Sequence, residues 1–557
     1  MKIIAFILTL LCISLDSFTQ VAPQKYFILF TDKNNSPFST DRPHEFLTDR
    51  SIERRARQGI EVVENDLPVN ENYIAAVKSV GGNVLTASKW LNGITIYTSD
   101  TMVINQIELL PFVAGVVKSV QNKEPGMNAL SDKFETEQAT IKPVTPQLLI
   151  THSASPESYN YGISYNQIHM VNGDQLHNLG YRGEGMVIAI LDGGFFMANT
   201  LPAFDSLRIN NQILGTKDFV VPGNNVYIEH PHGMEVLSII GGNLPGQLVG
   251  TAPKAKFWLL RSEDTNSEYL VEEYNWVSAA EFADSVGADV INSSLGYTTF
   301  DDTTMNHTCT DMSGDVTPVS KGANIAASKG LIVVNSAGNS GGSSWKCVGA
   351  PADAYMALAI AAVDSMGKHA QFSSTGTINN RVKPNLAAQG RATVLSAPDG
   401  SVSRGNGTSF SSPVIAGMMA CLWQAVRSLD YKTVIRAVEI SASKSLNPDS
   451  LLGYGIPDFA AALTRAGVEP DIQEVNVNVF PNPFTDHLTI VMPVAPARQV
   501  EVILYDLMGK TVYKQTCLKE GTGNNTINLA LPDNLKHSCY SLKLISDEFT
   551  IVTMICK

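Results

Sequence analysis

The hydrophobic positions repeat in three different ways along the chain, and these patterns divide it into three folded regions. From Lys25 to about Gln121, short apolar runs alternate with stretches of helical spacing. In the middle of the chain, continuous apolar runs of strand length alternate with amphipathic helices. The last part carries only short strand-like runs separated by turn residues. We therefore predict a multidomain chain that ends in a β-rich module.

The first region has the element order of a ferredoxin-like α+β fold. Strands are predicted at 26–30, 83–85, 93–97 and 113–120, and helices at 71–80 and 103–110. The basic stretch from Ser51 to Arg57 is predicted to be the solvated face of a helix. Residues 122–160 are rich in Pro, Thr, Ser, Asn and Glu and have little periodicity, so we predict a linker there.

The central region, 161–466, is predicted to be an α/β domain with a mostly parallel sheet. Buried strands are expected at 187–191, 257–260, 289–292 and 331–334, and an acidic amphipathic helix at 268–286. Strands that are apolar throughout need helices on both faces of the sheet, which gives three layers. Functional residues of such sheets gather at the carboxyl ends of the strands. Asp192 and Asn339 both follow predicted strands.

Ser409 stands at the start of a predicted buried helix, in the stretch Gly405-Asn-Gly-Thr-Ser409-Phe-Ser-Ser-Pro413. The helix is indicated by apolar residues at three- and four-residue steps, namely Ile415, Met418, Met419, Leu422 and Val426. Backbone N–H groups and the positive end of the helix dipole favour a developing negative charge beside Ser409. On its own such a serine is more often a simple helix cap.

Four segments together resemble the subtilisin-like serine proteases, the subtilases. Gly407-Thr-Ser409 with Pro413 resembles the nucleophile segment, and the strand ending in Asp192 resembles the orienting-aspartate segment. His232-Gly-Met-Glu-Val236 resembles the family's H-G-x-x-V segment, and the strand ending in Asn339 resembles its oxyanion segment. The order Asp192, His232, Ser409 is the subtilisin order of the triad.

The resemblance implies a subtilisin-like endopeptidase with Ser409 as nucleophile, His232 as general base, Asp192 as its orienting partner and Asn339 in the oxyanion hole. It also implies a substrate pocket with two walls of mostly small residues, which would admit a large apolar P1 side chain (the substrate residue just before the cleaved bond). The implied pocket residues are Ser294, Leu295, Gly296, Ser336, Ala337, Gly338 and Gly349. Cys309 and Cys347 flank the Asn339 strand and form a candidate disulfide, whereas Cys421 is expected to be a buried free thiol.

Several features of the sequence allow other interpretations. His230 competes with His232 for the role of base, but only His232 is followed by glycine and opens the predicted helix. Gly338-Asn-Ser-Gly-Gly342 imitates a chymotrypsin-like nucleophile segment, which the alternating α/β pattern disfavours. Met234 and Gly193 depart from residues common in the family. A pseudoprotease used for binding would need a broken triad, and an esterase would favour a G-x-S-x-G elbow, which Ser409 lacks.

The two ends of the chain indicate export. Residues 1–19 have a basic start and a short apolar run, as in a secretory signal peptide. Residues 20–121 resemble subtilase propeptides, which implies an intramolecular inhibitor and cleavage in the linker. Residues 472–557 are predicted to form a β-sandwich that resembles the C-terminal sorting domain of the type IX secretion system, and so imply that machinery as a partner and a Bacteroidetes-type source. A carbohydrate-binding or adhesion module is the competing interpretation.

Composition narrows the remaining choices. The formal charge of −13 argues against nucleic acid and gives no basic face for an anionic membrane. After the signal peptide we predict no membrane span. The signal peptide and the sorting domain lead us to expect the mature chain outside the cell or on its surface, acting on protein or peptide substrates. The chemistry requires no cofactor, and structural calcium stays unassigned. The natural substrate, the maturation sites, the oligomeric state and the pairing of Cys517, Cys539 and Cys556 stay open.

Overall fold

The computed structural model describes residues 24–119, 134, 159–376, 381–467, 478–491, 499–505, 511–518, 526–532, 535, 538–545 and 550–557. The predicted signal peptide and most of the predicted linker lie outside these residues. The chain forms two compact units, Met1–Val468 and Glu469–Lys557. The small N-terminal region and the central domain therefore belong to one unit.

The N-terminal region has the predicted ferredoxin-like sheet. Its strands are β1 (Lys25–Phe30), β2 (Asn83–Ser88), β3 (Gly93–Tyr97) and β4 (Val113–Lys118), in the spatial order β2-β3-β1-β4 with antiparallel neighbours. Its helices are α1 (Asp49–Arg57), α2 (Glu71–Ser79) and α3 (Thr101–Glu108). Asn70 and Asp100 cap α2 and α3 by accepting backbone N–H bonds, as such residues commonly do.

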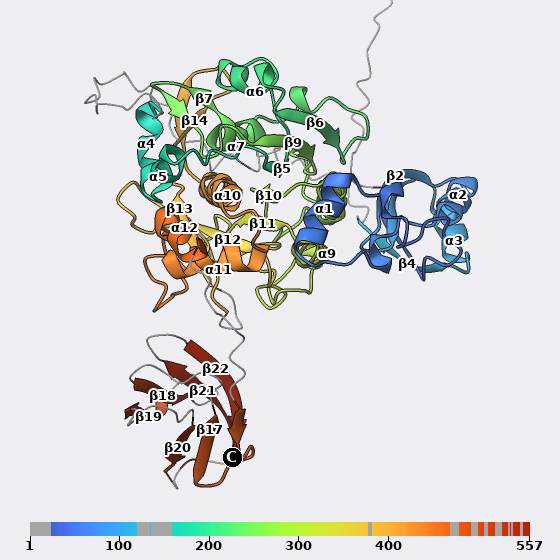
Figure 1. Cartoon of the computed structure of the whole chain (residues 1–557). Coiled ribbons are helices and arrows are strands. Elements are labelled where there is room, and N and C mark those ends of the chain that lie inside the picture. The colour runs from blue at the N-terminus through green and yellow to red at the C-terminus, as the bar shows by residue number, and fades with distance from the viewer. Residues whose placement is uncertain are drawn as a thin grey trace, which may run out of the picture. The chain divides into compact units, whose positions relative to one another are not determined.

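The central domain is built on seven parallel strands in the order β13-β12-β11-β10-β5-β9-β6. The strands are β5 (Val187–Asp192), β6 (Ile213–Asp218), β9 (Lys256–Arg261), β10 (Val290–Ser293), β11 (Ile332–Ser336), β12 (Leu358–Val363) and β13 (Leu386–Gln389). The main helices are α7 (His232–Gly241), α8 (Val271–Ser285), α9 (Pro318–Ser328), α10 (Thr408–Ala425), α11 (Tyr431–Ser441) and α12 (Phe459–Gly467). The predicted fold class is confirmed (Figure 1).

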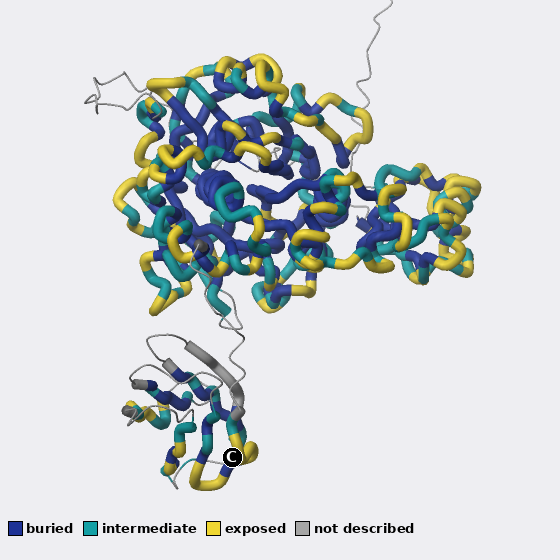
Figure 2. The backbone as a smooth tube through the Cα atoms, viewed as in Figure 1, coloured by how far each residue is buried: buried dark blue, intermediate teal, exposed yellow. Residues whose placement is uncertain are grey.

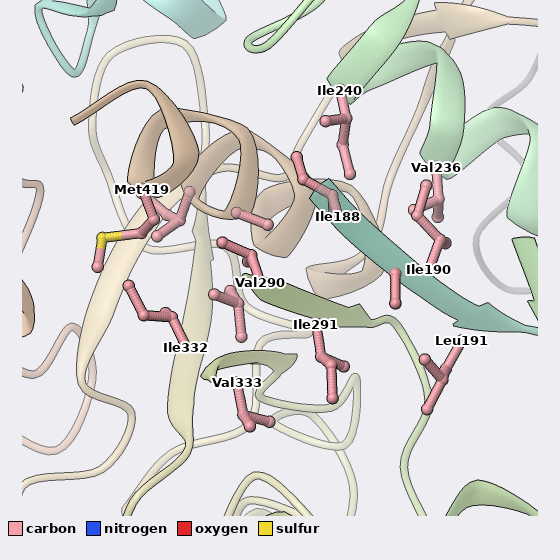
Figure 3. Close-up of a cluster of buried hydrophobic side chains, with 14 of the residues drawn as sticks. Ile188, Ile190, Leu191, Val236, Ile240, Val290, Ile291, Ile332, Val333 and Met419 are labelled. Carbon is pink, nitrogen blue, oxygen red and sulfur yellow. The ribbon is translucent and has the colours of Figure 1, made fainter. Parts of the chain in front are cut away.

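Helices cover both faces of this sheet because alternate strand residues point to opposite sides. Ile188, Val290 and Ile332 point toward Met419 of α10, whereas Ile291 and Val333 point to the other face (Figure 3). The central strands and most of α10 are buried, and exposed residues lie mainly on the outer helices, the loops and the edge of the sheet (Figure 2). The rigid sheet therefore fixes the positions of the residues at its carboxyl edge.

The sequence patterns missed several elements of this domain. Strands β6, β12 and β13 were not predicted, and neither was helix α9, which begins at Pro318. β6 is an edge strand with three exposed residues, and β12 has the sequence LAIAAV, whose alanines do not favour a strand. Short edge or alanine-rich strands carry little of the β-branched signal that identified the central ones.

The C-terminal unit consists of two antiparallel sheets around its own hydrophobic core, as the predicted sandwich requires. One sheet has β16 (Asn478–Phe480), β17 (His487–Val491) and β20 (Thr526–Ala530). The other has β19 (Thr511–Leu518), β18 (Gln499–Tyr505), β21 (Cys539–Ile545) and β22 (Thr550–Cys556), of which β22 was not predicted. Cys517 is a free thiol and Cys556 is disulfide-bonded.

The prediction of a solvated basic helix at 51–57 was wrong. Arg54 and Arg55 of α1 are each 1% exposed, because they pack against the central domain. Of the three arginines in this stretch, only Arg57, at the end of the helix, is exposed. Among the described residues, no helix combines the length and apolar character needed to cross a membrane.

Candidate active site

Asp192 and His232 meet at the carboxyl edge of the sheet. Asp192 ends β5 and His232 opens α7, and their side chains are 0% and 1% exposed. Asp192 Oδ1 lies 2.7 Å from His232 Nδ1 and also accepts the Gly193 N–H at 2.7 Å. Of the two candidate histidines, His232 is therefore the one placed against Asp192, in a geometry that fixes the orientation of its ring.

The close approach of α7 to β5 explains why a glycine, Gly233, follows His232. A Cβ at Gly233 would lie 2.4 Å from the Gly194 carbonyl oxygen and 2.8 Å from Asp192 Cβ. Both distances are shorter than real Cβ contacts, so any side chain here would push α7 away from β5. The glycine thus lets the histidine and the aspartate approach each other.

Ser409 is the second residue of α10 and is 2% exposed. Its Oγ lies 3.3 Å from the Ser294 carbonyl oxygen, and the Ser294 hydroxyl donates to the Ser409 carbonyl at 2.9 Å. The ring of the next residue, Phe410, lies 5.8 Å from the His232 ring, measured between centroids. The start of α10 is therefore held between His232 and the segment that extends β10.

The Asn339 side chain is oriented by Thr408, which the sequence patterns did not single out. Its Oδ1 accepts the Thr408 backbone N–H at 2.9 Å and the Thr408 hydroxyl at 3.0 Å. The same hydroxyl accepts the Gly338 N–H at 3.1 Å. Because Oδ1 is held in this way, Nδ2 is the atom that Asn339 presents as a donor. Thr408 directly precedes Ser409 in the chain, and this position is the signal that could have identified it.

These residues border a cleft with a volume of about 170 Å³. Every predicted pocket residue except Ala337 lines it, namely Ser294, Leu295, Gly296, Ser336, Gly338 and Gly349, and so do Asn339 and Ser409. Ala337 is instead buried behind the wall, in a small cluster with Val348, Ala352 and Ala359. Glu263, Glu268, Thr298, Ser340, Trp345, Ser374, Thr408 and Phe134 complete the lining.

Phe134 lies inside the site although it belongs to the segment predicted as a linker. Its ring stacks on the His232 ring, with 3.9 Å between centroids and 15° between planes, and its side chain is 9% exposed. A Cβ placed on Gly193 would lie 3.6 Å from the Phe134 ring. An aromatic residue from the N-terminal side thus covers one face of the histidine. As the only aromatic residue between 122 and 150, it could have been noticed in the sequence.

The segment between β10 and α9 is tied to the wall of the cleft by a disulfide. The structure joins Cys309 to Cys347, 38 positions apart, and leaves Cys421 as a buried free thiol. His307 in the same segment bonds to the buried Glu273 of α8. Burial alone would lower the pKa of His307, but its hydrogen bond to Glu273 and the charge of Glu273 outweigh this and raise it.

We expect the paired replacement Cys309→Ala with Cys347→Ala to lower the free energy of unfolding of the catalytic unit by about 4 kcal/mol. In the chain-entropy account, closing a loop of this size constrains the unfolded chain by about that amount. The measurement is the urea midpoint of the larger unit, followed by its tryptophan fluorescence. Cys517→Ala, which removes a free thiol of the other unit, should leave that midpoint unchanged; an equal midpoint for the paired variant would contradict the expectation.

One acidic group among the described residues could contribute to a cation site. Glu263, Glu268 and Glu272 each place an oxygen within 4.8 Å of the others. Calcium takes six to eight oxygen ligands, and Glu263 already accepts the Tyr297 hydroxyl at 2.8 Å. Three carboxylates supply only part of such a shell, so calcium stays unassigned and the chemistry below does not use it.

The fold and the site define an α/β domain in which an aspartate, a histidine and a serine gather at the carboxyl edge of a parallel sheet. Comparison with known proteins agrees: residues 183–455 match the subtilase family model, and residues 25–134 match the peptidase S8 propeptide domain of Bacteroidota. Residues 478–557 match the secretion system C-terminal sorting domain. The chain belongs to the subtilase family.

Similar curated proteins include subtilisin E of Bacillus subtilis (strain 168), 30% identical over 270 residues, which are 48% of this chain and 61% of that protein. The chain thus spans about three fifths of that relative. Subtilisin of Bacillus pumilus is also 30% identical over 270 residues, covering 48% of this chain and 85% of the relative. A solved structure, the prenylagaramide maturation protease PagA, is 24% identical with a TM-score of 0.43, over 53% of this chain and 98% of that one.

These matches confirm the resemblances stated for all three regions. They also place Phe134 at the end of the propeptide match, beyond residue 121, where the propeptide was predicted to end. The sorting-domain match supports export of the chain.

Proposed function

We propose that the protein is a secreted serine endopeptidase made as a self-inhibited precursor, with Asp192, His232 and Ser409 as its catalytic triad. The observation that carries this proposal is the 2.7 Å contact between Asp192 and His232 beside the start of the Ser409 helix. The subtilase membership of the domain and the attached propeptide match support it.

In the proposed reaction the residues act in sequence. Asp192 accepts the Nδ1–H of His232, which leaves Nε2 to take the proton of the Ser409 hydroxyl as its oxygen attacks the peptide carbonyl. The imidazolium is stabilised by Asp192 and returns the proton to the leaving amine. Water then hydrolyses the acyl-enzyme with His232 again acting as base.

The oxyanion that forms on the peptide carbonyl is assigned to two donors. One is the Asn339 side-chain amide, which Thr408 orients by donating a hydrogen bond to its Oδ1. The other is the Ser409 backbone N–H at the start of α10. Donors fixed in advance cost no reorganisation when the charge develops, which makes them effective in a water-poor cleft.

Asn339→Ala should therefore lower kcat by about 10²–10³ with little change in KM, the scale observed for such an asparagine in a subtilisin. The amide binds the oxygen more strongly in the transition state than in the substrate. Steady-state kinetics on a chromogenic peptide measure this. Asn324→Ala, in α9 and outside the cleft lining, is the control; a fall in kcat of less than about tenfold for Asn339→Ala would contradict the assignment.

The cleft is also proposed to favour a large apolar P1 residue, because its walls near Ser294 and Ser336 are small and Glu263 and Glu268 lie on its border. Carboxylates so close repel an acidic side chain. Peptides that differ only at P1 should be cleaved faster with Phe or Leu than with Glu, and we expect at least about tenfold in kcat/KM. Equal turnover of aromatic and acidic P1 peptides would refute this preference.

Latency is proposed to come from the propeptide, whose last matched residue covers the catalytic histidine. With Phe134 stacked on His232, a substrate chain cannot pass over the same face of the ring. Cleavage within 122–158 and loss of the propeptide would then open the cleft. Apart from Phe134, this segment lies outside the described residues. Export through the type IX secretion machinery, with either surface attachment or release, is proposed from the C-terminal match.

The proposal is tested by following two proteins on a gel, the chain from Gln20 as wild type and as Ser409→Ala. We expect the wild type to lose an N-terminal piece of roughly one hundred residues and to digest casein, and the variant to do neither. If both stay intact and inert, a pseudoprotease is favoured. If both mature, another protease does the processing. Turnover of simple esters without peptides would favour an esterase.

A further inference from the structure

Besides Phe134, and besides its small sheet, which contacts Glu281 and Tyr274 of α8, the propeptide contacts the catalytic domain through helix α1, on the side of the sheet away from the cleft. Helix α1 lies against the segments that precede β5, β10 and β11, which are the amino ends of these parallel strands (Figure 1). Asp289 precedes β10 and Ser294 follows it. At about 3.3 Å per residue, roughly 17 Å of strand separates the α1 contact from the cleft.

The centre of this contact is a buried group of charges. Arg54 donates to Asp284 Oδ1 at 2.5 Å, and Arg55 donates to Asp284 Oδ2 at 2.6 Å. The three side chains are 0–1% exposed. Arg54 also donates to the carbonyl groups of Ala288 and Lys329. Asp284 thus receives two arginines from the propeptide, and both of its oxygens are used.

The rim of the contact is shaped for the same helix. Arg50 donates to the Gly287 carbonyl at 2.8 Å and pairs with Asp289, and Gln58 donates to the Gly330 carbonyl at 3.0 Å. A Cβ on Gly287 would lie 2.7 Å from Arg50 Cγ, and one on Gly330 2.5 Å from Gln58 Nε2. Both glycines also have positive φ, +80° and +86°. The catalytic domain therefore has glycines where α1 approaches most closely.

Each side of the contact supplies both positive and negative side chains. Lys329 of the catalytic domain donates to Asn65 Oδ1 at 2.6 Å and to Asp66 at 3.1 Å in the propeptide, and Asp66 also holds Arg55. Burial would raise the pKa of Asp284, but the charges of Lys89, Arg55 and Arg54 outweigh it and lower this pKa to about 2. Removing one partner of an ion pair this deeply buried strongly weakens binding, because the other charge is left buried without a partner.

We propose that this surface, formed by Asp284, Asp289 and the carbonyl groups preceding β10 and β11, is an exosite for the propeptide. It binds a helix that carries arginines with the spacing of Arg50, Arg54 and Arg55, and it holds the cleaved propeptide whether or not the cleft is occupied. Its occupant after cleavage is the propeptide itself, bound in trans. The proposal rests on the proposed function only where the bound propeptide is called an inhibitor.

The test uses the full chain from Gln20 with Ser409→Ala, so that it does not depend on the chain's own proteolysis. A recognition sequence for a site-specific protease is inserted after Glu124, and the cut N-terminal fragment therefore lacks Phe134. Retention of the fragment is measured by gel filtration, and its Kd by dilution of a fluorescently labelled complex. We expect Arg54→Ala with Arg55→Ala to raise the Kd by about 30-fold or more.

Arg57→Ala is the matched control, because it removes an exposed arginine from the same helix and should leave the Kd within about twofold. An unchanged Kd for the paired variant would overturn the proposal and assign binding to the small sheet alone. If the paired variant does not fold, Arg50→Ala replaces it, since that side chain is 35% exposed at the rim. It should raise the Kd at least about threefold, and an unchanged value would equally overturn the exosite.

Discussion

Ser409→Ala should abolish peptide hydrolysis, lowering kcat by about 10⁶ while leaving the fold intact. Loss of the nucleophile in a subtilisin costs on this scale, because the remaining triad cannot act without it. Only the residual rate supplied by substrate binding and the oxyanion donors, about 10³–10⁴ above the reaction in water, would remain. The hydroxyl lies 3.3 Å from the Ser294 carbonyl oxygen, a long hydrogen bond whose loss should cost little stability.

The measurement requires the variant to be freed of its propeptide by a trace of wild-type enzyme, which is then removed before kinetics on a chromogenic peptide. Ser340→Ala is the matched control, since Ser340 lines the same cleft but has no part in the proposed reaction. It should keep kcat within a few fold of wild type. Retention of more than about 1% of activity by Ser409→Ala would place the nucleophile elsewhere.

Asp192→Asn should have the second largest effect, a fall in kcat of about 10⁴ with nearly unchanged thermal stability. An amide in place of the carboxylate can no longer stabilise the imidazolium, and it favours the wrong tautomer of His232 across the 2.7 Å contact. The shape and volume of the side chain are preserved, so the buried site should still pack as before. Stopped assays over long times give kcat, and calorimetry gives Tm.

A second buried aspartate, Asp353, provides a control that distinguishes an effect on catalysis from an effect on stability. Asp353 is 0% exposed, bonds to the Ser320 hydroxyl and accepts the Gly314 N–H at 2.8 Å. Asp353→Asn should lower Tm and leave kcat within a few fold. If Asp192→Asn lowered Tm but kept kcat, Asp192 would be a structural residue and the triad assignment would fail.

The candidate residues of the site could be chosen from the sequence because each belongs to a local motif. Asp192 and Asn339 follow strongly apolar strands, and Ser409 and His232 open apolar helices, so strand ends and helix starts were visible without tertiary information. The glycine after His232 was visible too, although its reason is a contact with Asp192 and the Gly194 carbonyl, 41 and 39 positions away in the chain.

The features that were missed depend on contacts between distant parts of the chain. The basic pattern of α1 is that of a solvated helix. Burial of Arg54 and Arg55 is made favourable by partners that include Asp284, which lies 229 positions after Arg55. Phe134 lies in a polar stretch without periodicity, and its place on His232 follows from the fold alone. The edge strand β6 and the alanine-rich β12 are strands because their neighbours in the sheet supply the hydrogen bonds.

The central claim is that His232 activates Ser409 as the nucleophile, and covalent labelling tests it most directly. The matured wild type and a matured His232→Ala variant would be treated with a fluorophosphonate, which phosphonylates activated serines, and digested for peptide mapping by mass spectrometry. One adduct per molecule, on Ser409 of the wild type and nearly absent from His232→Ala, is the result that we predict. An adduct on another serine, or equal labelling of Ser409 in both proteins, would contradict the account.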